Sequence, residues 1–266
     1  MQEANAVIIC NIDRLRMAIS ILSRGNLPCT TLNSLACVSK SSRSFSRSRS
    51  PAAVAWEVGG AKYLYRDDVQ LRQLDWNLQL LLNVMPQLRE SGTPFLFVSS
   101  QLAEEHDTVY GATKRLGEVW THLLNGVRVR LWNVYGSYED ENERSHVVAD
   151  FVHQALTKRR IEMMTTGEEV RQFIHVDDVC RAFHLAMQRR LQGLYDVTSF
   201  EWVRVLDLAQ IIGDLTGAEV VPGSRLGSTP LTPMVGKIPD WEPTLTLRKG
   251  LEAMVAFYRA RRKGVE

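Results

Sequence analysis

The chain has 266 residues, of which 45% are hydrophobic and 23% are charged, proportions that are typical of a globular protein. A formal net charge of +2 provides no strong field to attract a phosphate backbone, which argues against nucleic acid as a partner. No apolar run approaches the roughly 18 residues that are needed to cross a bilayer, so we expect no membrane partner.

The cysteines lack the spacing that is typical of metal ligands, and they stand at Cys10, Cys29, Cys37 and Cys180. We therefore expect no metal site, and reduced thiols in a cytoplasmic protein. An organelle address is the alternative, because residues 1–51 are rich in Ser and Arg and poor in acidic residues.

Residues 1–51 differ in composition from the rest of the chain. Between Arg14 and Trp56 there are seven basic residues and no acidic one, and residues 39–50 are of low complexity. Residues 6–10 have the pattern of a short strand, whereas we expect most of the segment to be disordered. Three origins are open: a transit peptide, a divergent or mistranslated replacement of the first half of a domain, and a phosphorylatable basic arm. We favour the replacement, because a transit peptide would precede a complete domain.

From residue 52 onward, strand and helix patterns alternate, which predicts an α/β fold. Residues 52–56 read as a strand, and residues 67–90 as a long amphipathic helix that ends at Gly92. Pro86 is expected to kink or break this helix, because proline lacks the N–H and crowds the preceding turn. Residues 95–100 begin with four apolar residues and end in Ser99 and Ser100, and the apolar run is typical of a central strand of a parallel sheet. The face of the helix that we expect to be buried consists of Val69, Leu71, Leu74, Leu78, Leu81, Val84 and Leu88.

A second amphipathic helix is predicted from Tyr110 to Leu124, with an apolar face made of Leu116, Val119, Trp120 and Leu123. At the start of a later helix, Asp177 and Asp178 are expected to cap free N–H groups. The remaining predicted elements are strands at 127–133, 161–164, 171–175 and 193–197, and helices at 147–158, 177–187, 205–216 and 244–261.

Tyr110 and Lys114 are four residues apart and therefore lie on the same face of the predicted helix. A cation beside a phenol favours the phenolate and lowers a pKa that is about 10 in water, so this tyrosine could accept a proton near neutral pH. Ser100 ends the preceding strand and could hydrogen-bond the same substrate oxygen. A surface tyrosine and lysine on an ordinary helix is the alternative, which the serines at the end of the strand disfavour.

Five separated stretches occur in order: Ala55-Trp-Glu-Val-Gly-Gly60, Phe97-Val-Ser-Ser100, Tyr110-Gly-Ala-Thr-Lys114, Arg130-Leu-Trp-Asn-Val-Tyr-Gly136 and Arg171-Gln-Phe-Ile-His-Val-Asp-Asp178. With these stretches, residues 52–258 resemble the extended short-chain dehydrogenase/reductases, specifically the NAD-dependent nucleotide-sugar epimerases and dehydratases. The resemblance implies a Rossmann-like parallel sheet, with its first βαβ unit degenerate or missing, and a smaller C-terminal substrate domain. It divides the chain into the remainder of a dinucleotide-binding domain at 52–160 and a mainly substrate-binding domain, with interleaved segments, at 161–266.

The resemblance also implies an activity, which is the transient oxidation of a sugar hydroxyl on a nucleotide-diphosphate sugar. Tyr110 would take the hydroxyl proton, Lys114 would hold the cofactor ribose and lower the pKa of the tyrosine, and Ser100 would hydrogen-bond the reacting oxygen. Asn133 and Arg171 would bind the substrate diphosphate, and a homodimer is one expected assembly. The cofactor would be NAD or NADP, contacted by Ala55, Trp56, Tyr110, Lys114 and Trp132.

The expected glycine-rich turn is not visible in the sequence. After the possible strand at residues 6–10, the first glycine is Gly25, whereas a dinucleotide site needs glycines where the backbone approaches the pyrophosphate. A nucleotide-sugar-binding protein without a working cofactor site is therefore the alternative to an enzyme, and a poorly folding truncated product is a third possibility. Gln101 and Leu102 stand where related dehydratases often carry acids, which favours an epimerase or a reductase over a dehydratase.

Overall fold

The computed structural model describes residues 60–64, 66–105, 107–137, 144–229 and 232–263, together with Trp56, Glu139 and the strand pairing of residues 7–9 and 53–54. Within these residues the main sheet is parallel, with strand order β2-β1-β3-β4-β9. A parallel sheet inside an α/β chain is the fold that the sequence predicts. Its strands are β1 (Val7–Ile9), β2 (Ala53–Val54), β3 (Phe95–Ser100), β4 (Val127–Leu131) and β9 (Gly193–Val197).

The short strands β1 and β2 lie within the ranges where the sequence predicts strands. β1 pairs on one side with β2 and on the other with β3, so it is an inner strand of the sheet. Apart from β1, the segment up to residue 51 lies outside the described part of the chain, so its predicted disorder stays a prediction. Ala55, a predicted cofactor contact, also lies outside the described residues.

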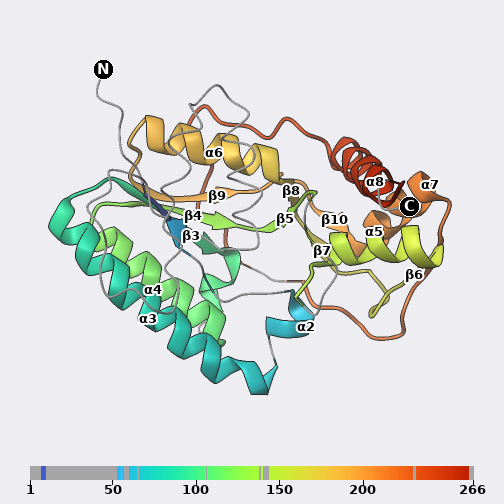
Figure 1. Cartoon of the computed structure of the whole chain (residues 1–266), viewed down its shortest axis with the longest axis horizontal. Coiled ribbons are helices and arrows are strands. Elements are labelled where there is room, and N and C mark those ends of the chain that lie inside the picture. Colours follow the sequence, from blue (N-terminus) through green and yellow to red (C-terminus); the bar gives the residue numbers. More distant parts are fainter. Residues whose placement is uncertain are drawn as a thin grey trace.

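Helices cover both faces of the main sheet (Figure 1). Helices α3 (Asp67–Ser91) and α4 (Val109–Leu123) lie on one face, and α6 (Val176–Gln188) lies on the other. Helix α4 approaches β3 closely because Gly117 has no side chain: a Cβ atom there would lie 2.2 Å from Cζ of Phe97. Gly92 ends α3 as predicted, with a left-handed φ of 61° that glycine adopts at little cost.

A second group of elements packs beside the carboxyl end of the main sheet (Figure 1). The group contains α5 (Val147–Lys158), β6 (Arg160–Glu162), β7 (Val170–Arg171), β10 (Val203–Arg204), α7 (Val205–Thr216), β11 (Glu219–Val221) and α8 (Leu247–Lys263). Its core lies mainly between the helices α5, α7 and α8. Helix α5 precedes residue 160 in the chain and nevertheless packs in this core, and the predicted division of the chain at residue 160 stays a prediction.

The strand predicted over residues 127–133 is divided at Trp132. Strand β4 pairs with β3 and β9, whereas β5 (Asn133–Tyr135) pairs with β8 (Phe173–His175). The chain thus leaves the main sheet at the residue that precedes Asn133. The described part also contains the short helix α2 (Ala61–Leu64) and the 3-10 turn η2 (Gln101–Glu104).

Several expectations about the helices are wrong. Helix α3 is not broken at Pro86, although a kink there stays a prediction, and Leu71, which we expected to be buried, is exposed. Of the predicted apolar face of α4, Leu116, Val119 and Leu123 are exposed, and only Trp120 packs partly buried against the core among the described residues. The helix buries Thr113, Glu118 and other residues instead. Asp178 does not cap α6. It accepts hydrogen bonds from the backbone of Thr244 and Leu245, while the ring of His175 caps the helix by accepting one from Asp177 N.

Candidate active site

Ser100 lies at the carboxyl end of β3, where the chain turns into η2. Its Oγ accepts a hydrogen bond of 3.2 Å from the backbone N–H of Leu102, which caps the turn and fixes the direction of the side chain. Ser100 is 8% exposed, so it is screened from solvent although it stands at the end of a strand. The sheet end places the hydroxyl where a parallel sheet offers ligand sites.

Helix α4 begins at Thr108, whose Oγ1 accepts a hydrogen bond from Gly111 N at 3.0 Å. This start places Tyr110 and Lys114 on the side of α4 that faces the protein interior, with exposures of 9% and 3%. The alternative of a surface tyrosine and lysine is therefore excluded. Nζ of Lys114 lies 5.7 Å from the centroid of the Tyr110 ring, so the two residues share one environment.

Lys114 is held by the end of β3 and by Trp56. Its Nζ donates a 2.7 Å hydrogen bond to the carbonyl of Val98 and lies 4.1 Å from the centroid of the Trp56 ring. A buried ammonium gains from both contacts, and cation–π contacts are worth up to about 2 kcal/mol or more when they are desolvated. The contacts hold the ammonium beside Tyr110, where a positive charge would favour the phenolate form of the tyrosine.

Two buried polar atoms have no hydrogen-bond partner within the part of the chain that the structure describes. One is Nε1 of Trp56, whose ring packs on Lys114 and on Phe97, and the other is Oε1 of Gln101, the residue after Ser100. Buried polar atoms are usually paired, and each unpaired one is a place where a ligand can gain a hydrogen bond. One of these atoms is a donor and the other an acceptor, and a ligand with hydroxyl groups, such as a ribose or a sugar, can pair with either kind.

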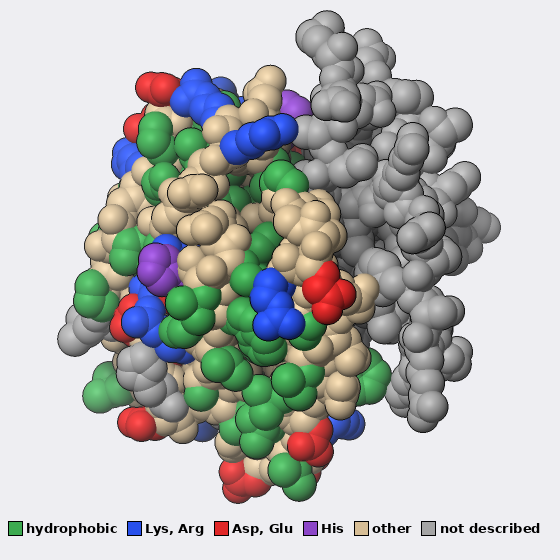
Figure 2. All heavy atoms as spheres, turned by 90° about the vertical axis from the view of Figure 1, so that its left-hand side faces the viewer, with side chains coloured by type: hydrophobic (Ala, Val, Ile, Leu, Met, Phe, Trp, Pro, Cys, Tyr) green, Lys and Arg blue, Asp and Glu red, His purple; other side chains and the backbone are tan. Residues whose placement is uncertain are grey.

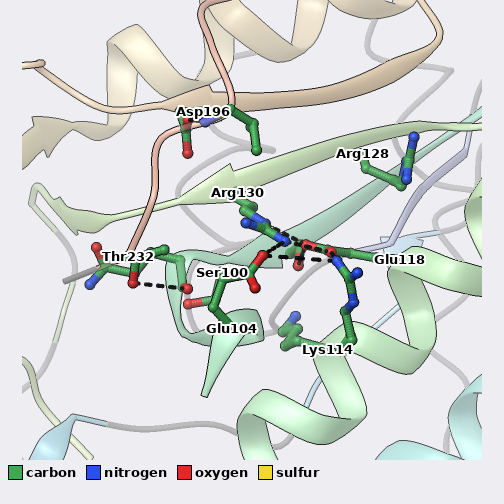
Figure 3. A network of polar contacts seen from close by, with 12 residues as sticks. Ser100, Glu104, Lys114, Glu118, Arg128, Arg130, Asp196 and Thr232 are labelled. Atoms are coloured by element: carbon green, nitrogen blue, oxygen red, sulfur yellow. Dashed lines mark hydrogen bonds and ion pairs between the residues drawn. The ribbon is translucent and has the colours of Figure 1, made fainter. Parts of the chain in front are cut away.

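A buried ion-pair network that the sequence analysis missed lies beside Lys114 (Figure 3). Arg130 on β4 donates from Nε and Nη2 to the two carboxylate oxygens of Glu118 at 2.8 and 2.9 Å. Ser99 Oγ adds a hydrogen bond to Glu118 at 2.6 Å, and Glu104 pairs with Arg130 at 2.6 Å. Glu118 stands four residues after Lys114, and this spacing was the signal that could have identified it.

The network keeps both charges ionised inside the protein. Burial raises the pKa of Glu118, but hydrogen bonds from Arg130 and Ser99 outweigh it, so the pKa lies below its usual value. Burial likewise lowers the pKa of Arg130, and its bonds to Glu118 and Glu104 raise it overall. The network connects η2, α4, β3 and β4 through their side chains. It therefore holds α4, the helix that carries Tyr110, against the sheet.

Trp132 follows β4 and is held by a buried carboxylate. Its Nε1 donates a 3.0 Å hydrogen bond to Oδ1 of Asp196, while Oδ2 accepts hydrogen bonds from Val235 N at 2.6 Å and Gly236 N at 3.2 Å. The same segment reaches η2, where Thr232 Oγ1 donates to the carbonyl of Gln101 at 3.4 Å (Figure 3). We name residues 232–237 the strap, since they connect β9 with the end of β3.

Asn133 and Arg171 are brought near each other by the residue between β7 and β8. Both the backbone N and Nδ2 of Asn133 donate to the carbonyl of Gln172, at 3.2 and 3.1 Å. Arg171 donates to Val170 O at 2.8 Å and to Ser228 O at 2.5 Å, so its guanidinium lies against the loop that follows β11. Asn133 is thus hydrogen-bonded to Gln172, the chain neighbour of Arg171. Asn133 and Arg171 are the two residues that the resemblance assigns to the diphosphate.

Two features are absent from the described residues. Among them, no group of three or more His, Cys, Asp and Glu side chains could hold a metal ion. No helix in the described part has the length and apolar character needed to cross a membrane.

Burial lowers the pKa of His175 more than Asp177 and Asp178 raise it, which suits the neutral ring that caps α6.

Comparison with known proteins gives a family match over much of the chain. The model of the NAD dependent epimerase/dehydratase family matches residues 43–197. A dTDP-L-rhamnose 4-epimerase from Burkholderia thailandensis is 30% identical over 220 residues, which are 74% of this chain and 56% of that protein. A dTDP-4-dehydro-6-deoxy-D-allose reductase from Streptomyces bikiniensis is 29% identical over 168 residues, 58% of this chain and 51% of that protein.

A third relative, UDP-glucuronic acid decarboxylase 1 from Arabidopsis thaliana, is 25% identical over 168 residues, 57% of this chain and 38% of that protein. The chain thus spans between 38% and 56% of the length of these three relatives.

Solved structures share the fold. UDP-glucose 4-epimerase from Thermotoga maritima, solved with UDP-glucose, has a TM-score of 0.69 at 19% identity, covering 98% of this chain and 100% of that chain. A dTDP-glucose 4,6-dehydratase from Bacillus anthracis, solved with NAD, has a TM-score of 0.66 at 15% identity, covering 98% of both chains.

Proposed function

Because the chain belongs to the NAD dependent epimerase/dehydratase family, we propose that it oxidises and re-reduces a sugar hydroxyl of a nucleotide-diphosphate sugar, as an epimerase does. The observation that carries this proposal is the buried pairing of Tyr110 with Lys114 at the end of β3. A lysine that is only 3% exposed is costly to bury and is seldom found without a specific task.

The described residues suit distinct parts of this chemistry. Tyr110 is the group that takes the proton of the substrate hydroxyl, and Lys114 keeps a positive charge beside the phenol. Ser100, held by Leu102 N, orients the same hydroxyl. When bound, NAD accepts the hydride from the carbon that carries this hydroxyl and returns it. Trp56, Tyr110 and Lys114 would hold the nicotinamide and ribose end of NAD, and the unpaired Nε1 of Trp56 fits a cofactor oxygen.

An epimerase is favoured over a dehydratase by the residue that follows Ser100. Elimination of water needs an additional acid and base near the sugar, and Gln101 is a neutral amide there, buried with its Oε1 unpaired. An amide binds a hydroxyl but does not exchange a proton with it near neutral pH. Gln101 therefore supports binding of the sugar and a simple oxidation and reduction.

The diphosphate is placed by residues at the other end of the site. Arg171 offers a planar, permanently charged guanidinium, which suits phosphate oxygens, and Asn133 lies one residue away through its contact with Gln172. UDP and dTDP sugars are the substrates to test first, because the relatives and solved structures named above act on or bind such sugars.

The experiment is an epimerisation assay on the purified chain with NAD and UDP-glucose, UDP-galactose or dTDP-glucose, followed by NMR of the anomeric protons. We expect a slow approach to an epimer mixture that Tyr110→Phe reduces about 10²- to 10⁴-fold, the usual contribution of general acid–base catalysis. The melting temperature of Tyr110→Phe should equal that of the unchanged chain, because the ring is kept. Binding of the nucleotide sugar without any turnover would instead support the non-catalytic alternative.

We also propose a homodimer that forms through α3 and α4. Apolar side chains gather on this side of the molecule (Figure 2), and the exposed ones include Leu71 and Leu82 on α3 and Leu116, Val119 and Leu123 on α4. Burying them in a second copy would remove a large apolar area from water. Light scattering after gel filtration should give the mass of two chains, and Leu123→Lys should give the mass of one.

A cytoplasmic location is likewise a proposal, and it rests on the cysteine pattern of the sequence. Cys180 is a free, buried cysteine, and burial raises its pKa to about 12, so the thiol stays protonated and unreactive. Imaging of a fluorescently tagged chain tests the location, and enrichment in an organelle would contradict it.

A further inference from the structure

Ser100 is oriented by the short turn that follows it. The backbone N–H of Leu102 donates a 3.2 Å hydrogen bond to Ser100 Oγ, and this bond fixes where the hydroxyl points. The turn η2 has only four residues, and a 3-10 turn has poorer hydrogen-bond geometry than an α-helix, so it holds its own position weakly. The direction of the Ser100 hydroxyl therefore depends on the contacts that hold η2 in place.

Glu104, the last residue of η2, ties the turn to the buried network (Figure 3). Its Oε1 lies 2.6 Å from Nη2 of Arg130, and the Arg130 side chain is 1% exposed whereas that of Glu104 is 34% exposed. The strap also contacts η2, where Thr232 Oγ1 donates to the carbonyl of Gln101, but at 3.4 Å. Charge-assisted hydrogen bonds are shorter than neutral ones and roughly twice as strong. Of these two side-chain contacts, the ion pair is therefore the firmer hold on the turn.

The helix that carries Tyr110 has a hold of its own. Thr108, which caps α4, donates from its backbone N and from Oγ1 to the carbonyl of Glu105, at 3.2 and 3.0 Å. These bonds do not involve the carboxylate of Glu104. Loss of that carboxylate therefore leaves the start of α4 in place, and its effect falls on Ser100 at the other end of the turn.

We propose that Glu104 is a positioning residue for Ser100. Its ion pair with Arg130 holds η2 against the sheet, so that Leu102 N keeps the Ser100 hydroxyl aimed at the reacting sugar oxygen. The inference rests on the proposed function, in which Ser100 orients that oxygen. Because Glu104 acts only through the turn, its removal should affect the reacting step rather than the binding of the nucleotide sugar.

The first test measures kcat and KM in the epimerisation assay with NAD for the unchanged chain, Glu104→Ala and Glu104→Gln. Glu104→Ala should lower kcat about 2- to 10-fold, the weight of one ordinary hydrogen bond, and leave KM for the nucleotide sugar unchanged. Glu104→Gln should recover part of the loss, because the amide oxygen can still accept from Arg130. Asp207→Ala is the matched control, since Asp207 on α7 is 38% exposed and pairs with Arg204 at 2.7 Å, and it should keep the kcat of the unchanged chain. Unchanged kcat in Glu104→Ala, or a loss that appears only in KM, overturns the positioning role while the proposed function stands.

A second test shows whether Glu104 acts through Ser100. Ser100→Ala removes the hydroxyl that the turn orients, so adding Glu104→Ala in that background should lower kcat no further. A double variant whose kcat falls by the product of the two single effects overturns the inference, because Glu104 would then act independently of Ser100. Glu104→Ala should also melt well above Glu118→Ala, since Arg130 keeps Glu118 as its partner, and the comparison is thus made between folded chains.

Hydrogen exchange gives a readout that does not depend on turnover. The Leu102 amide should exchange about 2- to 10-fold faster in Glu104→Ala than in the unchanged chain, because its bond to Ser100 opens more often. An unchanged exchange rate overturns the positioning role alone. An unchanged chain that epimerises none of the nucleotide sugars named above overturns the proposed function, and the positioning role with it.

Discussion

Removal of the Glu118 carboxylate is the sharpest test of how the site is held together. Glu118 and Arg130 are each 1% exposed, and they form two hydrogen bonds with each other, with a third from Ser99 to Glu118. In Glu118→Ala the guanidinium of Arg130 keeps only Glu104, which is partly exposed, and Ser99 loses its acceptor. The buried positive charge then lacks most of its compensation.

The expected loss follows from the burial of the pair. Breaking a buried ion pair by removing one partner costs about 3–5 kcal/mol, because the other charge is left in a poorly solvating interior. For a chain of this size, each kcal/mol lowers the melting temperature by about 2–4 °C, which predicts a fall of about 6–20 °C for Glu118→Ala. Thermal unfolding followed by circular dichroism measures this shift directly.

Two further variants separate the buried pair from ordinary surface electrostatics. Asp240→Asn breaks the exposed pair with Arg189 and should cost only about 0–1 kcal/mol. The double variant Glu118→Leu with Arg130→Met removes both buried charges and should be more stable than Glu118→Ala, because no buried charge is left without its partner. A melting temperature for Glu118→Ala within the range of Asp240→Asn would refute the reasoning.

The same carboxylate gives a pH dependence with a defined sign. The pKa of Glu118 lies below its ordinary value of 4.5 in the folded chain, so the unfolded chain binds the proton more readily. The contribution of Glu118 to stability is therefore fully present above about pH 4.5 and is lost as the pH falls through the folded pKa. The stability difference between the unchanged chain and Glu118→Gln should shrink on acidification, and a difference that grows below pH 4.5 would contradict the assignment.

Three other changes test the packing and the site. Gly117→Ala places a Cβ atom 2.2 Å from the ring of Phe97 and should destabilise the chain by about 1–3 kcal/mol in chemical denaturation, whereas unchanged stability would mean that α4 can move away from the sheet. Asp196→Ala leaves the indole N–H of Trp132 unpaired and frees the strap, so tryptophan fluorescence should shift to longer wavelength and proteolysis should cut near the strap; an unchanged spectrum would argue against this hydrogen bond. Lys114→Met should lower turnover and NAD affinity together, and loss of only one of them, measured by steady-state kinetics and calorimetry, would contradict the double role.

Local patterns in the sequence were enough to predict many elements and the shared helix face of Tyr110 and Lys114 in the candidate site. The helices at 147–158 and 205–216 and the strand at 193–197 have their predicted bounds. Their apolar spacing, turn residues and length are properties of a few neighbouring residues, which the sequence displays directly. Tyr110 and Lys114 share a face for the same reason, since a spacing of four residues fixes their relation in any α-helix.

Tertiary structure decided which way a face points and which distant residues meet. The apolar stripe of α4, with Leu116 and Leu123, was correctly found but points outward, because periodicity shows that a stripe exists and not what it packs against. The inner face of α4 can carry Glu118 because Arg130, twelve residues later on strand β4, compensates its charge. Asp178 likewise holds a backbone segment 66 residues away.

The sequence by itself therefore determined the α/β fold, the order of its elements and the pairing of Tyr110 with Lys114, since these depend on residues within a few turns of each other. Only the tertiary structure showed the strap that Asp196 holds and the ion pair of Glu104 with Arg130. Both depend on contacts between segments far apart in the chain. Such contacts form where complementary charges, hydrogen-bond donors and rings come together in the folded chain. The spacing of residues along the sequence does not predict which distant segments come together.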